Sequence, residues 1–252
     1  MARTHWTAVT VLAATLVVAA CGGGGATTAP ATVAPTSQAG TGGTGGTGVG
    51  GAVAKLEDLS SYKFSMVMAA EGAAGFAQVK SGGSMTISGT AILKPAIAMD
   101  LTMATKDKAG KEGSFSYRII GDKAYASFGP DTWMETKASD ATNLINAYKP
   151  ETFMSSFGSL GDLKAVGDET RNGVNATHYK GDAPASVGSS FGLPGGTWTV
   201  EAWVAKEGGY LVSSALVGEA SDGKFTITMD ISDFDSPGNK VEVPANVTPL
   251  GG

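Results

Sequence analysis

The sequence predicts a mainly β, α+β domain in which one strongly curved antiparallel sheet, or an open barrel, carries two short helices on its concave side. Three observations lead to this prediction. Apolar and polar residues alternate with a period of two over many short stretches, which is typical of half-buried strands. Gly, Pro and Asn residues separate these stretches where hairpin turns belong. Two stretches in the middle of the chain have apolar residues at helical spacing instead.

The first half of the domain reads as a meander of strands. Lys94-Pro95, a polar loop over 107–113 and Gly121-Asp122 supply the turns, and a further turn at 128–131 leads to Trp133. The strands that the alternation predicts run over 62–69, 84–91, 97–103, 115–120 and 123–126.

Two helices and a second meander follow. The first helix is expected over 139–149, with Ser139 or Asp140 as its N-cap, and the second over 151–157 after Pro150. Asn172-Gly173 between two strand patterns is a strong hairpin signal. A Gly/Ser/Pro-rich excursion spans 183–196, and irregular backbone is expected over 233–237 and 241–244. The strands of this half are predicted over 163–169, 174–181, 197–205, 210–218 and 224–234.

The composition excludes several classes of function. The formal net charge of −5 and the pI near 5.0 argue against a nucleic-acid-binding protein, which needs a basic patch to neutralise phosphates. A single Cys excludes an internal disulfide framework and a Cys-based zinc cluster. With only two His residues in the chain, little remains for metal or acid–base chemistry.

The N-terminus has the layout of an export signal. Arg3 precedes an uncharged stretch over 6–20 that is too short to span a bilayer comfortably as a helix. Small residues then precede Cys21, which resembles a bacterial lipobox. That resemblance implies diacylglycerol on the Cys21 thiol and cleavage before Cys21, so that acyl chains anchor the mature protein. The alternative is an ordinary signal peptide in which Cys21 is incidental.

A tether follows the anchor. Residues 22–51 consist almost entirely of Gly, Thr, Ala, Pro and Ser, and such a segment cannot bury enough apolar surface to order itself. The expected organisation is a signal peptide over 1–20, the lipidated Cys and tether over 21–51, a folded domain over 52–247 and a tail over 248–252.

Methionine is the most informative residue type of the domain. Met is flexible and polarizable, so it suits either a cavity wall that accepts varied apolar shapes or irregular gaps in a core, and both readings stay open. The candidate lipid-binding residues are the large apolar side chains that the alternation places on one face and that the second helix adds: Phe64, Met66, Met68, Met85, Ile87, Met99, Leu101, Met103, Phe153 and Phe157.

The lipobox, the tether and the strand–helix–strand order together resemble the LolA-like lipoproteins, and in particular the actinobacterial lipid-transport lipoproteins of the LppX/LprG type. The likeness covers about residues 53–244. It implies a half-barrel sheet with helices over its concave face, enclosing an apolar cavity for acyl chains, and it brings no catalytic residues. Its local motifs are Gly89-Thr90-Ala91, 120–125, Trp133, 167–170, Asn172-Gly173, 177–179, 200–204 and 208–211.

Enzymatic and metal sites are not expected. His178 stands on a predicted strand, and a catalytic role would need a nucleophile and an orienting carboxylate beside it. Asp222, Asp230, Asp233 and Asp235 could donate oxygens to a cation, but the spacing of a calcium loop is absent, so solvated turn acids are the expected reading. No dinucleotide or phosphate-binding loop is present, and no cofactor is predicted.

Two hypotheses of function remain in the foreground. The first is an exported lipoprotein, held by Cys21 on the outer side of the bacterial cytoplasmic membrane, that binds acyl chains of a lipid or lipoprotein and carries or presents them. The second is an envelope sensor or interaction module of the same fold, which binds a partner protein and has no carrier activity. An envelope hydrolase that uses His178 is a weaker third.

Overall fold

The structure is a computed structural model that describes residues 49–72, 79–129, 132–137, 163–183 and 196–249, with isolated positions between 139 and 152 and at 187. The first described elements are the helix α1 (Val49–Ala54) and the 3-10 helix η1 (Lys55–Asp58). No helix within these described residues is long and apolar enough to cross a membrane.

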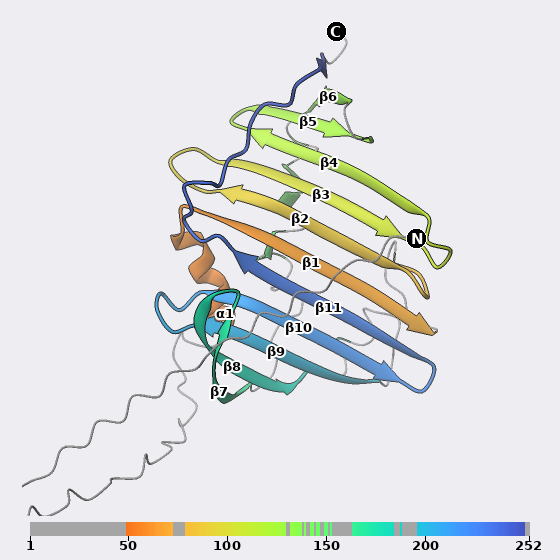
Figure 1. The fold of residues 1–252 in the computed structure, drawn as a ribbon, viewed down its shortest axis with the longest axis vertical. Helices are drawn as coiled ribbons and strands as arrows, with labels where there is room; N and C mark the ends of the chain where they lie inside the picture. The colour runs from red at the N-terminus through yellow and green to blue at the C-terminus, as the bar shows by residue number, and fades with distance from the viewer. Residues whose placement is uncertain are drawn as a thin grey trace, which may run out of the picture. The chain divides into compact units, whose positions relative to one another are not determined.

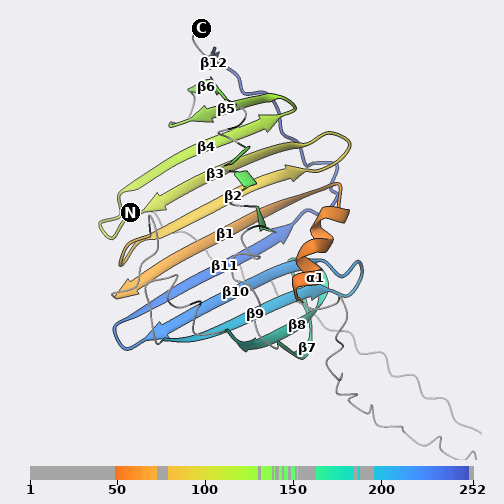
Figure 2. The same ribbon diagram turned by 180° about the vertical axis from the view of Figure 1, so that it is seen from behind.

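Twelve strands form one open sheet (Figure 1, Figure 2). The N-terminal strands are β1 (Ser61–Gly72), β2 (Ser84–Ile92), β3 (Ala98–Lys106), β4 (Glu112–Ile120), β5 (Lys123–Ser127) and β6 (Trp133–Thr136). The C-terminal strands are β7 (Lys164–Arg171), β8 (Val174–Asp182), β9 (Thr197–Ala205), β10 (Leu211–Ala220), β11 (Gly223–Ser232) and β12 (Val247–Thr248).

The sheet is made of two meanders joined at its centre. The spatial order is β12-β6-β5-β4-β3-β2-β1-β11-β10-β9-β8-β7, so the first strand pairs with the last long one. That central pairing is antiparallel and runs from Lys63↔Ser232 to Gly72↔Gly223. All other neighbours are also antiparallel except β12 and β6, which pair in parallel through Val247↔Trp133. The predicted class, a mainly β domain with one large curved sheet, is confirmed.

Turn chemistry accounts for the hairpins that the sequence predicts. Asn172 and Gly173 both have positive φ, 51° and 78°, as a two-residue hairpin loop of the primed type requires. Gly121, with φ 62°, closes the β4–β5 hairpin. The irregular backbone expected after β11 is present, and Asp233 and Asp235 there have φ values of 52° and 50°.

Three elements escaped the sequence analysis. β6 is only four residues long, and β12 is a two-residue strand at the expected boundary between the domain and its tail. α1 begins at Val49, inside the Gly-rich stretch that was expected to belong to the tether, and it packs against β9 and β10. Its buried residues Val49 and Val53, with Leu56 of η1, recur at intervals of four and three, a helical period that glycine-rich surroundings hid.

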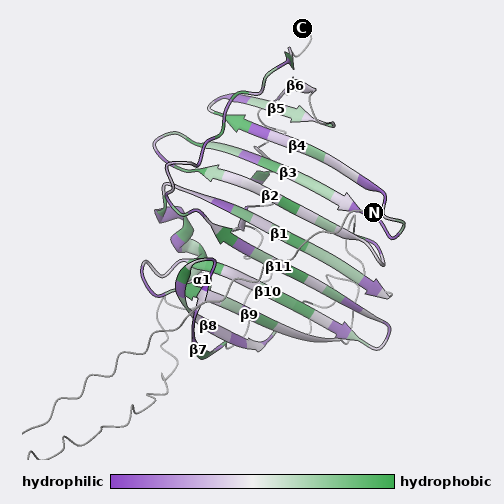
Figure 3. Ribbon diagram, in the orientation of Figure 1, coloured by the Kyte–Doolittle hydropathy of each residue, from purple (hydrophilic) through white to green (hydrophobic). Residues whose placement is uncertain are grey.

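Hydropathy alternates from residue to residue along many of the strands (Figure 3), so the two faces of the sheet carry different side chains. The inner face carries Phe64, Met66 and Met68 of β1, and the outer face carries Ser65 and Val67 of the same strand. Because side chains alternate along a strand and pair in register across strands, each face continues over the neighbouring strands. The main apolar core lies on the inner face.

The connection between the two meanders joins opposite edges of the sheet, since β6 lies near one edge and β7 forms the other. Thr142, Ile145 and Thr152 have helical backbone, in the ranges where helices were predicted. Ile145 is 2% exposed and belongs to the inner-face core, so the connection reaches the inner face at this point. The rest of the predicted helices, with Phe153 and Phe157, lies outside the described residues.

Candidate functional site

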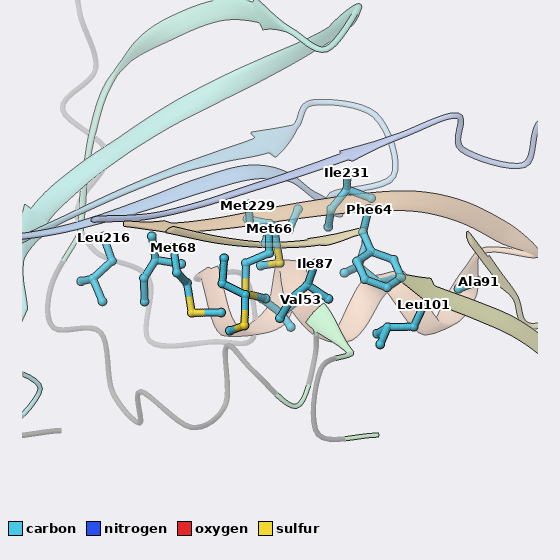
Figure 4. Packing of buried hydrophobic residues seen from close by; sticks show 14 of the residues in the cluster. Val53, Phe64, Met66, Met68, Ile87, Ala91, Leu101, Leu216, Met229 and Ile231 are labelled. Atoms are coloured by element: carbon cyan, nitrogen blue, oxygen red, sulfur yellow. The ribbon is translucent and has the colours of Figure 1, made fainter. Parts of the chain in front are cut away.

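The inner face of β1, β2 and β3 collects eight of the ten predicted binding residues. They alternate with polar residues along each strand, which is why they share one side of the sheet. Each is at most 3% exposed, and all belong to one core cluster: Phe64, Met66, Met68, Met85, Ile87, Met99, Leu101 and Met103. Figure 4 shows those of them that it labels, with Met229 and Ile231 of β11, projecting from the same side of the sheet.

The strand register sets these side chains in rows perpendicular to the strands. Met66 lies between Met229 on β11 and Ile87 on β2, and Ile87 is followed by Met103 on β3. Directly opposed residues have their Cβ atoms about 4.5–5.5 Å apart, so this row is a continuous apolar strip. Thioether side chains make up much of the strip, and their flexibility lets the surface adapt to the shape of what lies on it.

One glycine is required for this face to pack. An added Cβ on Gly89 would lie 2.2 Å from the Asp100 carbonyl oxygen and 2.9 Å from Phe64 Cζ. The Phe64 ring therefore occupies the space over Gly89, which no other residue type would leave open. Close packing with Phe64 thus explains the glycine of the Gly89-Thr90-Ala91 motif.

Several separate segments cover the inner face. Val53 of α1 and Leu56 of η1 are 7% and 0% exposed and belong to the same cluster as the methionines. Ile145 and Val187, from the connections before β7 and before β9, belong to it as well. Among the described residues, the cover therefore consists of short pieces that come from distant parts of the chain.

His178 lies on the outer face and is held by its neighbours. Its Nε2 is 3.1 Å from Glu201 Oε2, and its ring stacks on Trp203 with centroids 4.4 Å apart. Lys180 Nζ donates to the other Glu201 oxygen at 2.7 Å. This hydrogen bond, followed by the charges of Lys180 and His178, lowers the pKa of Glu201. The pairing uses the imidazole to bridge β8 and β9, which is a structural role.

Two of the four aspartates near the C-terminus, Asp230 and Asp235, accept structural hydrogen bonds. Asp230 Oδ1 accepts hydrogen bonds from Ser213 Oγ and Asn172 Nδ2, at 2.8 and 3.1 Å. Asp235 Oδ1 accepts from the backbone N–H of Ser60 and Ser61. In the part of the chain that the structure describes, no group of three or more His, Cys, Asp or Glu side chains is arranged to hold a metal ion.

Sequence reasoning missed a second, smaller core on the outer face, where the β7–β8 hairpin closes over the sheet. Trp203 is 6% exposed and packs with Ala176 and Val212. Its Nε1 donates to Glu169, and the Arg171 guanidinium lies 4.5 Å from its ring centroid. Trp203, an aromatic residue on the mostly polar side of the β9 alternation, was the available signal.

An open groove of about 1,140 Å³ lies beside this hairpin. It runs between β7–β8 and the turn after β9, and Asp168, Asn175, Lys206 and Tyr210 are among the residues that line it. Lys206 is paired with Asp168. The groove is open, is lined by both polar and apolar residues, and lies at the β7–β8 end of the sheet rather than over the methionine-bearing strands, so it is unlike the enclosed apolar cavity that the resemblance implies.

The comparisons with known proteins agree with this architecture. The model of the LppX_LprAFG lipoprotein family matches residues 83–241, from just before β2 to beyond β11. The chain belongs to the LppX_LprAFG lipoprotein family. It is accordingly a lipoprotein of lipid-binding fold from a family of the bacterial envelope, and the predicted LolA-like, LppX/LprG-type identity is confirmed.

Relatives of known sequence and structure accompany this match. An uncharacterized 31.2 kDa protein from the rplA–rplJ intergenic region of Streptomyces griseus is 30% identical over 218 residues, which cover 72% of this chain and 68% of that protein. The lipoprotein LppX of Mycobacterium tuberculosis is 18% identical, with a TM-score of 0.41 over 74% of this chain and 92% of that one. LprF of Mycobacterium bovis is 13% identical, with a TM-score of 0.46 over 79% and 95%.

Two sets of predicted site residues lie outside the described residues. One is Cys21, the expected site of lipidation, and the other is the pair Phe153 and Phe157. The other eight candidate residues are brought together on one face, as the alternation predicted, and ligand binding by this face is taken up next.

Proposed function

We propose that this member of the LppX_LprAFG lipoprotein family binds the acyl chains of a lipid or lipoprotein on its inner face and carries or presents them in the envelope. The protein acts without catalysis, and Cys21 holds it on the outer side of the cytoplasmic membrane. The observation that carries the proposal is the row of thioether and branched side chains over β11, β1, β2 and β3, covered by short separate segments.

The chemistry of the inner face suits an alkyl chain. Each methylene that leaves water contributes about 0.8 kcal/mol, so about ten methylenes offset a sizeable cost of association. The formal net charge of −5 offers no electrostatic attraction to an anionic head group. Binding is therefore expected to depend on chain length and only weakly on salt.

The test is uptake of a fluorescent fatty acid by the delipidated protein, together with mass spectrometry of lipids extracted from protein purified without detergent. Ala91→Met on the inner face is the informative variant, because Ala91 is 0% exposed beside Met99. If the inner face borders a space for the ligand, the added methionine side chain fills that space. Uptake of the fatty acid is then weaker, and the melting temperature is the same as that of wild type. Ala104→Met is the matched control, since Ala104 is exposed on the outer face of the adjacent strand.

The proposal fails if wild-type protein neither takes up the probe nor releases lipid on extraction. It also fails if Ala91→Met lowers the melting temperature by the equivalent of about 1–3 kcal/mol, as overpacking of a solid core does, and leaves uptake unchanged.

A second candidate function is an envelope interaction module that binds a protein partner. The observation that favours it is the open groove of about 1,140 Å³ beside the β7–β8 hairpin, which both polar and apolar residues line. This function would be supported if the lipid-free wild-type protein captured an envelope protein and the Tyr210→Ala variant did not. Capture that is unchanged in Tyr210→Ala would count against it.

A further inference from the structure

The inner face continues without interruption to one edge of the sheet. Paired residues form a row that crosses the strands from β11 to β6. In order, this row consists of Ile231, Phe64, Gly89, Leu101, Tyr117, Ala126 and Met134. Every member except Gly89 presents an apolar or aromatic side chain, so the row is an apolar path from the centre of the core to β6.

Exposure is highest at the far end of this path. Ile231 and Leu101 are fully buried at 0% and Ala126 is 5% exposed, whereas Met134 is 45% exposed. Between them, Tyr117 and Phe115 on β4 are half-buried and contact each other edge to face, with ring centroids 5.8 Å apart. The inner face is therefore buried over β1–β3 and at Ala124 and Ala126 of β5, and it becomes exposed at Met134 of β6.

The other side of the same face is closed. Trp198, Val200 and Ala202 on the inner face of β9 are 3%, 2% and 0% exposed, and α1 packs against β9 and β10. An exposed thioether at the end of a buried apolar path is thus a feature of the β6 side. A lone exposed Met would need no explanation, but Met134 continues, in register, the inner-face row that begins at Ile231 and Phe64 in the core.

The β6 edge is also weakly held. β6 has four residues, and its outer partner β12 contributes only Val247 and Thr248 to the sheet. Short edge pairings with few buried contacts open locally at low cost in free energy. A ligand can therefore pass this edge without unfolding the central strands.

We propose that the β6 edge is the entrance through which a single extended acyl chain reaches the inner face. The chain meets Met134 first, then slides past the Tyr117 and Phe115 rings to the methionine strip. This inference rests on the proposed function, because it names the route to the same inner face. Its ligand class is an unbranched alkyl chain, whether it arrives as a free monomer or from a bilayer.

The test compares the rates of uptake of a fluorescent fatty acid by wild type, Met134→Glu, Met134→Leu and Val67→Glu. Val67 is a matched control because it is an apolar strand residue of similar exposure, 39%, on the outer face. A carboxylate at the entrance must be partly desolvated as the alkyl chain passes, which raises the barrier to entry. Met134→Glu is expected to slow uptake at least tenfold, whereas Met134→Leu and Val67→Glu keep the wild-type rate.

Two deliveries of the probe are used, a monomeric solution below its critical micelle concentration and phosphatidylcholine vesicles that contain it. Slower uptake by Met134→Glu in both deliveries supports the entrance. If Met134→Glu slows uptake from vesicles alone, the entrance is overturned, because the edge would then act by contact with the membrane. Equal slowing of uptake by Val67→Glu also overturns it. A variant whose melting temperature falls is replaced by Thr136→Glu on the same edge. Absence of uptake by wild type refutes the proposed function itself, whereas normal uptake by Met134→Glu refutes the entrance alone.

Discussion

Individual side chains show why this sequence has one register. Phe64 fills the space over Gly89, and the Trp198 ring similarly occupies the space over Gly218, where an added Cβ would lie 2.4 Å from it. A large ring on one strand thus requires a glycine on the next. A slip of one residue would place every methionine of the inner face on the outer face.

Gly89→Ala is expected to destabilise the protein by about 1–3 kcal/mol, because its Cβ overlaps the Asp100 carbonyl and the Phe64 ring. Chemical denaturation followed by tryptophan fluorescence measures the change. Gly167→Ala is the control, since an added Cβ at this strand glycine of β7 meets nothing within 4 Å. Equal stability of the two variants would contradict the packing described for Phe64.

Acidification is expected to weaken the contact between β8 and β9. The hydrogen bond from Lys180 holds the pKa of Glu201 below its ordinary value of 4.5. A carboxyl with a lowered pKa in the folded state stabilises the fold above the unfolded-state pKa, and this contribution is lost as the pH falls from about 4.5 through the folded-state pKa.

Glu201→Gln tests this contribution, because the amide does not titrate. The variant should melt at a lower temperature than wild type at pH 7, and the difference should shrink as the pH is lowered toward 3. Melting curves at a series of pH values provide the measurement. A difference between the two proteins that stays constant with pH would exclude the ion pair as its cause.

At the level of elements, the hairpins and the β7 edge were predictable, and the edge formed by β6 and β12 was not. Alternation and local turn residues such as Asn172-Gly173 define the long strands, because both signals are contained in neighbouring residues. β6 and β12 are too short to show a period, and their pairing depends on how Val247 meets Trp133 across the fold. α1 owes its place to burial of Val49 and Val53 rather than to helix propensity, which Gly50 and Gly51 lower.

The β7–β8 hairpin is fastened to the sheet at its tip. Asn172 Nδ2 donates to Asp230 Oδ1, to the Val212 carbonyl and to the Ile231 carbonyl, at 3.1 to 3.3 Å. Arg171 Nη2 lies 3.5 Å from the same Asp230 oxygen. Contacts of this kind join residues that are distant in sequence, and their only local signal is Trp203 on the mostly polar side of the β9 alternation, so the small core around Trp203 was not predicted.

Asp230→Ala is expected to cost about 1–3 kcal/mol, because it leaves Ser213, which is 0% exposed, and Asn172 without their shared acceptor. Hydrogen exchange should show faster opening of β7 and β8 and unchanged protection of β2 and β3. Asp122→Ala, at the exposed β4–β5 turn, is the control. Uniform loss of protection over the whole sheet would contradict a local fastening role.

For the whole molecule, the alternation that defines the strands also separates the apolar inner face from the mainly polar outer face. The apolar face of each strand, with Met66, Met85 and Met99, could be predicted because an alternation with a period of two is visible in neighbouring residues. The sequence could not show which segments cover them, since Ile145 and Val187 reach the core through long connections. Membership of a lipoprotein family places this apolar face in a protein whose expected anchor is Cys21.

Cys21→Ser is expected to release the protein from the membrane fraction while the domain stays folded, because the thiol that carries the lipid is lost. Fractionation of cells after a high-salt wash, followed by a melting curve of the released protein, measures both effects. Retention of the variant in washed membranes would show that another anchor exists.

The central claim is that an acyl chain lies against the inner face of the sheet. Photo-crosslinking with a diazirine-bearing fatty acid, followed by peptide mass spectrometry, tests it most directly. The account predicts labels on Met66, Met99 or Met103 and their inner-face neighbours, competed away by unlabelled fatty acid. Labels confined to outer-face residues such as Val67, or labelling that excess fatty acid does not reduce, would contradict it.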